Sequence, residues 1–341
     1  MSSSPARYGR SSSLLALLVL LIGATVTANA DEARIFAVAD AAALDDPYPD
    51  RITHFPDQVI GLADVTYSTL PGFRPLVVDI YRPMRHDNAK PLVLYIHGGG
   101  WMNGHTRHLG ALTDFPAVLA RLASEGFVVA SPEYRLSGEA PFPAALQDAR
   151  AALRFLKANA AKYGIDPTRT GVFGGSAGGH LAALTALTCG DTSLDPEPAP
   201  AGSECVQAVV TWYGAFDFAP IVAAAAKDRS ADDPVLKFLG CAAGHCTAAA
   251  IERASPINRV TAKAPPFLLI HGEADAVVPV QQSHAFEAQL AAAGVPVEAI
   301  YIGGAGHSWI GATPADTRSA TLRATNATFD FFRSELGGLT R

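Results

Sequence analysis

The segment TGVFGGSAGGH, residues Thr170–His180, places five glycines around a single serine. Ordering a glycine costs more backbone entropy than ordering other residues, so glycines gather where a side chain would block the path of the chain. Gly174, Ser176 and Gly178 form the pattern G-x-S-x-G between a short apolar run and an amphipathic stretch that begins near Ala177. A strand, a tight turn and a helix in this order expose the serine hydroxyl above a sheet. The pattern therefore indicates a sharp turn that carries a reactive serine rather than a merely flexible loop.

The rest of the chain alternates between apolar runs typical of strands and stretches with helical spacing. The predicted strands are Ala63–Leu70, Pro75–Tyr81, Pro91–His97, Phe127–Ser131, Gly171–Gly174, Gln207–Gly214, Phe267–Gly272 and Glu298–Gly303. A Pro-Gly turn joins the first two, which predicts an antiparallel hairpin at the edge of a sheet. The later runs alternate with predicted helices such as Pro143–Gly164, which favours an α/β fold: a mostly parallel sheet with helices on both faces. Residues 216–257 exceed the usual length of a connection, and we expect a small helical cap there.

A serine hydroxyl is a weak nucleophile at neutral pH and needs a base that an acid orients. The segment FLLIHGEADAVVPV presents Glu273 and Asp275 directly after a predicted strand, and YIGGAGHSW places His307 after the next strand. Serine, acid and histidine then follow one another in the order that this architecture requires. The sequence predicts a catalytic triad of Ser176, Asp275 and His307, with Glu273 as the alternative acid.

The segment YIHGGGWMNG offers donors for the oxyanion of a tetrahedral intermediate. Gly98, Gly99 and Gly100 follow a buried strand, where backbone N–H groups can turn toward the site, and the N–H of Ala177 can complete the pocket. A phosphate-binding loop is the alternative, but no Lys-Ser/Thr pair follows the glycines and G-x-G-x-x-G is not matched. We expect His97 to be a structural residue beneath this loop.

Four cysteines allow three disulfide pairings. Local pairing of Cys189 with Cys205 and of Cys241 with Cys246 closes two short loops and leaves no cysteine over. A metal site would need tighter ligand clusters, whereas the ten histidines are scattered and HExxH does not occur. We therefore predict two local disulfides, no metal and no cofactor.

The first thirty residues resemble a secretory signal peptide more than part of the fold. Arg7 and Arg10 precede the apolar run 14–25, and ANA at 28–30 has the small residues of a cleavage site. The run is short for a membrane span, although a membrane-anchored form is the alternative. We expect an exported domain of residues 31–341, periplasmic or secreted. The net charge of −6 and the lack of a Lys/Arg cluster argue against a nucleic-acid partner.

The motifs HGGGW, GGSAGGH, HGEADAVVP and GHSW together resemble the α/β-hydrolases of the esterase and lipase group that carry an HGGG motif. The likeness covers about Gly61–Phe332 and is nearest to the branch of bifunctional acetylxylan and feruloyl esterases. It implies an α/β-hydrolase fold and a cofactor-free serine carboxylic-ester hydrolase acting on short-chain acyl esters or on acetyl and feruloyl esters of carbohydrates. By the resemblance, the nucleophile, acid and base are Ser176, Asp275 and His307, and the oxyanion donors are Gly99, Gly100 and Ala177.

Other functions of the same fold stay open at this point. The downstream half is also similar to prolyl oligopeptidase catalytic domains, so a serine peptidase or amidase is the main alternative, and an inactive binding protein is a further one. Aromatic and sulfur-containing side chains near strand ends are candidates for the substrate pocket: Trp101, Met102, Trp212, Tyr213 and Trp309. Such aromatic side chains could stack on a sugar or an aromatic acyl group, or could simply pack in the core.

Overall fold

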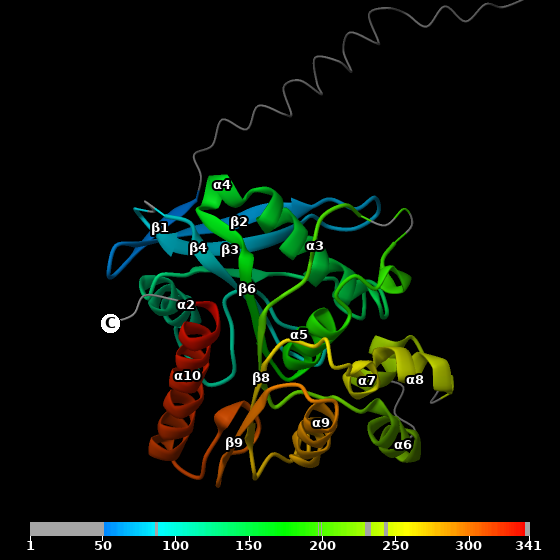
Figure 1. Ribbon diagram of the computed structural model, residues 1–341. Coiled ribbons are helices and arrows are strands. Elements are labelled where there is room, and N and C mark those ends of the chain that lie inside the picture. Colours follow the sequence, from blue (N-terminus) through cyan, green and yellow to red (C-terminus); the bar gives the residue numbers. More distant parts are fainter. Residues whose placement is uncertain are drawn as a thin grey trace, which may run out of the picture. The chain divides into compact units, whose positions relative to one another are not determined.

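Nine strands among the described residues hydrogen-bond into one sheet in the order β1-β2-β3-β5-β4-β6-β7-β8-β9 (Figure 1). The computed structural model describes residues 51–337 except 86–87, 197, 199, 229–232 and 242–244, so the predicted signal peptide lies outside the described residues. The strands are β1 (Ile52–Phe55), β2 (Val59–Ser68), β3 (Leu76–Pro83), β4 (Lys90–Ile96), β5 (Val128–Pro132), β6 (Ile165–Gly175), β7 (Ala208–Trp212), β8 (Phe267–Gly272) and β9 (Val297–Ile302).

The sheet is parallel from β5 to β9 and antiparallel at its N-terminal edge, as the sequence predicts. β4 pairs in parallel with β5 and β6, and β6, β7, β8 and β9 continue the parallel series. β2 and β3 form the predicted antiparallel hairpin, and β3 pairs antiparallel with β5. The edge strand β1 was not predicted, because its four residues are almost all exposed and therefore show no apolar alternation.

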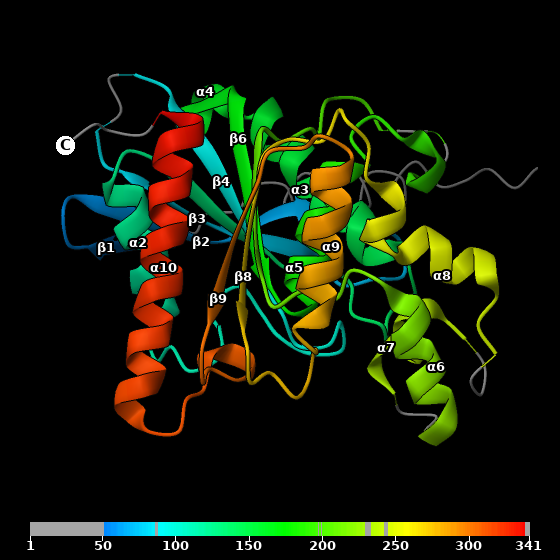
Figure 2. The ribbon, with the colours of Figure 1, turned by 60° about the horizontal axis from the view of Figure 1, so that its bottom comes forward.

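Two hydrophobic clusters cover the two faces of the sheet, because successive side chains of a strand point to opposite faces. In β4, for example, Leu92 and Leu94 belong to one cluster, whereas Val93 and Tyr95 belong to the other. Figure 2 shows α3, α5 and α9 against one face and α2 and α10 against the other. The bounds of these helices are α2 (Phe115–Ser124), α3 (Ala144–Ala158), α5 (Ala177–Leu187), α9 (Gln281–Ala292) and α10 (Pro314–Leu336).

The helix predicted over 143–164 is interrupted once. α3 ends at Ala158, and the short helix α4 (Ala160–Tyr163) follows and ends at Gly164, whose φ of 72° suits a C-terminal cap. At the break, the side-chain amide of Asn159 donates to the carbonyl of Phe155 at 2.8 Å. Such a local bond from an asparagine competes with continued helix, which explains the interruption.

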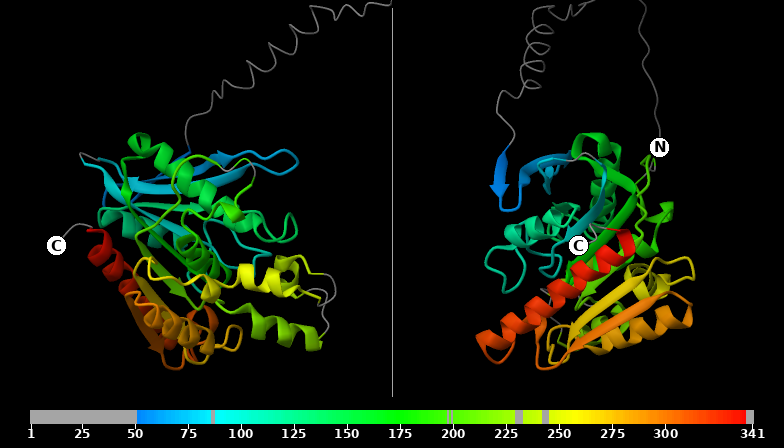
Figure 3. Two further views of the ribbon diagram at one scale, coloured as in Figure 1. Left: turned by 45° about the vertical axis from the view of Figure 1, so that its right-hand side comes forward. Right: turned by 60° about the vertical axis from the view of Figure 1, so that its left-hand side comes forward.

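The connection between β7 and β8 is helical, with α6 (Phe218–Asp228), α7 (Pro234–Leu239), α8 (Ala248–Ala254) and a 3-10 turn at Pro256–Arg259. These helices lie together beside α5 and α9 (Figure 2), and Figure 3 shows the same group, in yellow-green to yellow, from further sides. The structure pairs Cys241 with Cys246 after α7 and Cys189 with Cys205 after α5, as local pairing predicts. Within the described ranges, no helix has the length and apolarity that crossing a bilayer requires.

Candidate active site

Ser176 lies in a strained turn between β6 and α5. Its φ is 56°, a region that residues with a Cβ seldom adopt, and such strain concentrates at functional sites. The neighbouring glycines are required by space: a Cβ on Gly178 would come within 2.0 Å of the Ile96 carbonyl oxygen, and one on Gly174 within 2.5 Å of the Gly178 backbone. The five-glycine segment therefore serves a sharp turn packed against β4, not flexibility.

Three distant loops bring a hydroxyl, an imidazole and a carboxylate into one chain of hydrogen bonds. His307 Nε2 lies 3.0 Å from Ser176 Oγ, and His307 Nδ1 lies 2.7 Å from Asp275 Oδ2. Ser176 follows β6, Asp275 follows β8 and His307 follows β9, so all three lie at the carboxyl ends of parallel strands. In this arrangement Nδ1–H donates to the carboxylate, which leaves Nε2 free to accept the serine proton.

Asp275 is placed to remain ionised. Its Oδ1 accepts the backbone N–H groups of Val277 and Val278, both at 2.9 Å. Burial alone would raise its pKa, but hydrogen bonds from His271, His307 and Val278 outweigh burial and hold the pKa of Asp275 below its usual range. The alternative acid Glu273 is exposed, and the structure brings Asp275, not Glu273, to His307.

His271 is a further contact of the acid that the sequence analysis missed. It is fully buried, and its Nε2 lies 2.9 Å from the Val278 carbonyl oxygen and 3.4 Å from Asp275 Oδ2. Its Nδ1 lies 2.7 Å from Ser283 Oγ. Because a carbonyl only accepts, Nε2 carries the proton. The signal for this residue was the four-residue spacing between histidine and aspartate in HGEAD.

The glycine loop after β4 has the conformation that its sequence suggests. Gly99 and Gly100 have φ of 113° and 60°, in the region that favours glycine. Among the described residues, the structure records no acceptor for the N–H groups of Gly99, Gly100 and Ala177. A Cβ on Gly98 would come within 2.6 Å of the Gly175 carbonyl oxygen, so this loop and the Ser176 turn pack backbone to backbone.

His97 has a structural setting, as we expected from its position. Its side chain is buried and stacks on the ring of Tyr134 at 4.2 Å between centroids. The Tyr134 hydroxyl donates to the His97 carbonyl at 3.0 Å, and His97 Nδ1 lies 2.8 Å from the Gly98 carbonyl oxygen. These contacts hold the first residue of the glycine loop.

The candidate pocket residues divide into several settings. Tyr213 packs against the His307 ring, with centroids 4.7 Å apart, whereas Met102 is half-buried in the turn after Gly100. Trp212 lies in the core instead and donates its indole N–H to Thr328 of α10 at 2.8 Å. Trp309 is also buried and packs edge-on against Trp212 and Tyr213. Trp101 is buried as well, against the helices α6 and α7.

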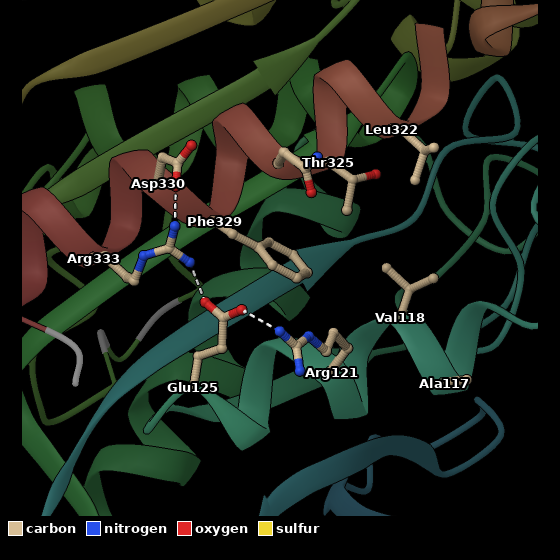
Figure 4. A pocket seen from close by; sticks show the side chains of 10 residues that line it. Ala117, Val118, Arg121, Glu125, Leu322, Thr325, Phe329, Asp330 and Arg333 are labelled. Carbon is tan, nitrogen blue, oxygen red and sulfur yellow. Dashed lines mark hydrogen bonds and ion pairs between the residues drawn. The ribbon is translucent and has the colours of Figure 1, made fainter. Parts of the chain in front are cut away.

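A groove of about 570 Å³ lies away from this site, between α2 and α10. Figure 4 shows Glu125 between Arg121 and Arg333, with Phe329 next to this group and Val118 further along α2. Its lining includes neither the serine, the histidine nor the aspartate described above, and its charged groups pair with one another. This groove therefore shows no arrangement of side chains comparable to the hydrogen-bonded triad.

Comparison with known proteins sets this geometry in a family. Residues 78–290, more than half of the chain, match the model of the BD-FAE family. The chain belongs to this family. The resemblance to the esterase group of α/β-hydrolases is thereby confirmed, and the fold agrees with it. The described residues hold no group of three or more His, Cys, Asp or Glu side chains arranged to bind a metal.

Several relatives of this BD-FAE chain are named esterases. Esterase LipC of Mycobacterium tuberculosis is 35% identical over 227 residues, which are 64% of this chain and 53% of LipC. Esterase LipQ of the same organism is 33% identical over 68% of this chain and 53% of its own length. The chain thus spans about half the length of the curated relatives it matches.

Solved structures give the same picture for the fold. A truncated form of a carbohydrate esterase from gut microbiota has a TM-score of 0.67 and 29% identity, over 83% of this chain and 99% of that one. An acetyl ester-xyloside bifunctional hydrolase from Caldicellulosiruptor lactoaceticus has a TM-score of 0.63 and 26% identity, over 80% of this chain and 96% of that one. The chain is thus similar in sequence to named esterases and in fold to solved carbohydrate-ester hydrolases.

Proposed function

We propose that this chain is a serine carboxylic-ester hydrolase in which Ser176 is the nucleophile, His307 the general base and Asp275 the orienting acid. The observation that carries the proposal is the continuous hydrogen-bonded path from the Ser176 hydroxyl through His307 to the buried carboxylate of Asp275. The strained backbone at Ser176 adds support, because it lifts the hydroxyl out of the turn toward the imidazole.

The reaction would proceed in two acyl-transfer stages. His307 Nε2 takes the Ser176 proton as Oγ bonds to the ester carbonyl carbon, and the carbonyl oxygen becomes an oxyanion. The unengaged N–H groups of Gly99, Gly100 and Ala177 stabilise that charge. The C–O bond to the alcohol then breaks, and His307 donates its proton to the departing oxygen. In the second stage His307 takes a proton from water, hydroxide attacks the acyl-enzyme, and the proton returns to Ser176 as the acid leaves.

The substrate class is proposed to be short-chain acyl esters, including acetyl or feruloyl groups linked to carbohydrate. The named carbohydrate esterase and acetyl ester-xyloside hydrolase among the structural neighbours support this class. We also propose that the helices within 216–257 form a cap that shapes the pocket. Pro234 of α7 supports this role, since a Cβ on Gly100 would lie 3.3 Å from the Pro234 ring.

Export of a mature domain of residues 31–341 is part of the proposal. Two disulfides support it, because such bonds persist in oxidising compartments and are rare in the cytosol. N-terminal sequencing of the protein recovered from the culture medium and from the cell envelope would test the cleavage site after Ala30.

The test of function compares esters of several acyl groups with amides, one of which, p-nitroacetanilide, carries the same acetyl group as the acetyl ester. Purified protein is given acetyl, butyryl, octanoyl and feruloyl esters together with p-nitroacetanilide and a peptide amide, with Ser176→Ala as the blank. We expect turnover of acetyl and feruloyl esters that Ser176→Ala abolishes. Faster cleavage of the amides than of the esters would assign the site to a peptidase or amidase instead.

A further inference from the structure

A further buried histidine lies one helical turn beyond the nucleophile, and the proposed reaction does not use it. His180 of α5 ends the GGSAGGH motif, and its side chain has no exposed surface. Its backbone N–H donates to the Ser176 carbonyl at 3.0 Å, so the two residues belong to the same rigid first turn of α5. A buried imidazole in the same helical turn as the nucleophile requires an explanation.

Both ring nitrogens of His180 have partners, and these partners fix its tautomer. The indole N–H of Trp101 donates to His180 Nδ1 at 3.2 Å, and His180 Nε2 donates to the Ala254 carbonyl at 2.8 Å. An indole N–H only donates and a carbonyl only accepts, so the ring must be neutral with its proton on Nε2. Burial lowers the pKa of His180 to about 4, which is consistent with a neutral ring at physiological pH.

Trp101 is the residue that directly follows Gly99 and Gly100. Its φ is 57°, so the chain leaves the glycine loop in a conformation that a tryptophan would not adopt without support. The indole stacks on Phe238 of α7 at 4.6 Å and meets Phe218 of α6 edge-on at 5.6 Å. The Trp101 carbonyl accepts the backbone N–H of Ser137 at 2.8 Å. Ring and backbone of Trp101 are thus both held in place.

We propose that His180 is a positioning residue for oxyanion binding: by holding the Trp101 indole against α5, it fixes the Gly99 and Gly100 amides relative to Ser176. The inference rests on the proposed function and adds a residue to it. The Trp101–His180 contact spans the two elements that must stay in register, the glycine loop after β4 and the first turn of α5. Misplacing oxyanion donors by a fraction of an ångström weakens transition-state binding more than substrate binding.

The test uses Trp101→Phe, which keeps an aromatic ring but removes the indole donor. Thr328→Val is the matched control, because it removes the partner of another buried indole N–H, that of Trp212, on the opposite face of the sheet. For each variant, kcat and KM for p-nitrophenyl acetate are measured. The concentration of active sites, determined with a phosphonylating titrant, is used to calculate kcat. We expect Trp101→Phe to lose about 10- to 100-fold in kcat with little change in KM. Thr328→Val should lose stability but keep its kcat per site.

Two further variants separate positioning from packing. His180→Asn offers an amide oxygen near the place of Nδ1, whereas His180→Leu offers no acceptor, so the first should retain more kcat than the second. The double variant Trp101→Phe/His180→Leu should be no slower than the slower single variant, because both changes break one contact. The inference would be wrong if kcat per site of Trp101→Phe stayed within about twofold of wild type, or if Thr328→Val lost as much kcat as Trp101→Phe. Either result would leave the proposed function intact. Wild-type protein without ester turnover would overturn the proposed function, and the inference with it.

Discussion

At the scale of single residues, the site depends on positions where no side chain fits. The backbone of the Ser176 turn touches the backbone of the glycine loop and of β4, so the hydroxyl and the oxyanion donors are held by main-chain packing. Main-chain packing tolerates almost no adjustment, because no flexible side chain can move aside. Small substitutions here should therefore have large effects.

Gly178→Ala tests this main-chain contact directly. The added Cβ would come within 2.0 Å of the Ile96 carbonyl oxygen, so the turn or β4 has to shift. We expect the free energy of unfolding to fall by about 3 kcal/mol and ester turnover to be largely lost. Gly138→Ala is the control, since nothing lies within 4 Å of a Cβ there. Urea unfolding of the two variants tests this prediction. Equal unfolding midpoints for Gly178→Ala and Gly138→Ala would contradict it.

The choice of acid is a second prediction at this scale. Asp275→Asn keeps the size of the side chain but loses the charge that orients His307, and kcat should fall by about 10⁴. Glu273→Gln should leave kcat within about threefold of wild type, because Glu273 is exposed and the His307 contact belongs to Asp275. Steady-state kinetics of both variants decide the matter, and a larger loss in Glu273→Gln would transfer the role of the acid.

At the scale of elements, a buried charge cluster joins α3 to the loop closed by the Cys189–Cys205 disulfide. Arg150 of α3 is fully buried and pairs with Asp195 at 2.9 Å and with Glu204 at 3.4 Å. Arg154, one turn later, bonds both carboxylates again, at 2.9 and 3.0 Å. The disulfide therefore joins the two ends of this loop, and the two arginines hold the carboxylates within it against α3.

Arg150→Met tests the role of this cluster. Removing one charge leaves buried carboxylates only partly compensated, so the free energy of unfolding should fall by about 3 kcal/mol or more. Arg51→Met removes an exposed partner of Asp64 and should cost less than about 1 kcal/mol. Equal losses in the two variants, measured by denaturant unfolding, would show that the buried cluster contributes no more than a surface pair.

At the scale of the whole molecule, two buried neutral histidines make stability depend on pH. Burial lowers the pKa of His97 and of His180 to about 4, and neighbouring His105, Arg74 and His108 lower that of His97 further. Hydrogen bonds to the carbonyls of Gly98 and Ala254 act in the opposite direction. Because the unfolded chain binds these protons near pH 6.5, it gains protons before the folded chain does.

The contribution of these two histidines to the free energy of unfolding should therefore be constant between about pH 6.5 and pH 7.5 and fall by about 3 kcal/mol per histidine as the pH drops toward 4. His180→Asn removes one of the two titrating histidines, so the change in the free energy of unfolding with pH should be about half as large. Urea unfolding at several pH values between 7.5 and 4.5, a range that includes the pKa of unfolded histidine, measures both effects. An unfolding free energy independent of pH in the wild type would contradict the account.

Features that are local in the chain could be predicted from the sequence, and features that depend on distant neighbours could not. The strands, the Pro-Gly hairpin and both disulfide pairs follow from short patterns. The approach of His307 to Ser176, 131 residues apart, is the exception, and it was predicted from the order of the motifs along the chain. Whether Trp212 faces a pocket or the core depends on Thr328, more than a hundred residues away. The contacts of His180 with Trp101 and Ala254 span 79 and 74 residues, so the motif displayed that histidine without indicating what it touches.

The central claim is that Ser176 carries the acyl group between ester and water. The most direct measurement is mass spectrometry of the protein quenched during turnover of p-nitrophenyl acetate, followed by peptide mapping. One acetyl group is expected on the peptide that contains Ser176, accumulating in the wild type and absent in Ser176→Ala. Acetyl found on another residue, or ester turnover that persists in Ser176→Ala, would contradict it.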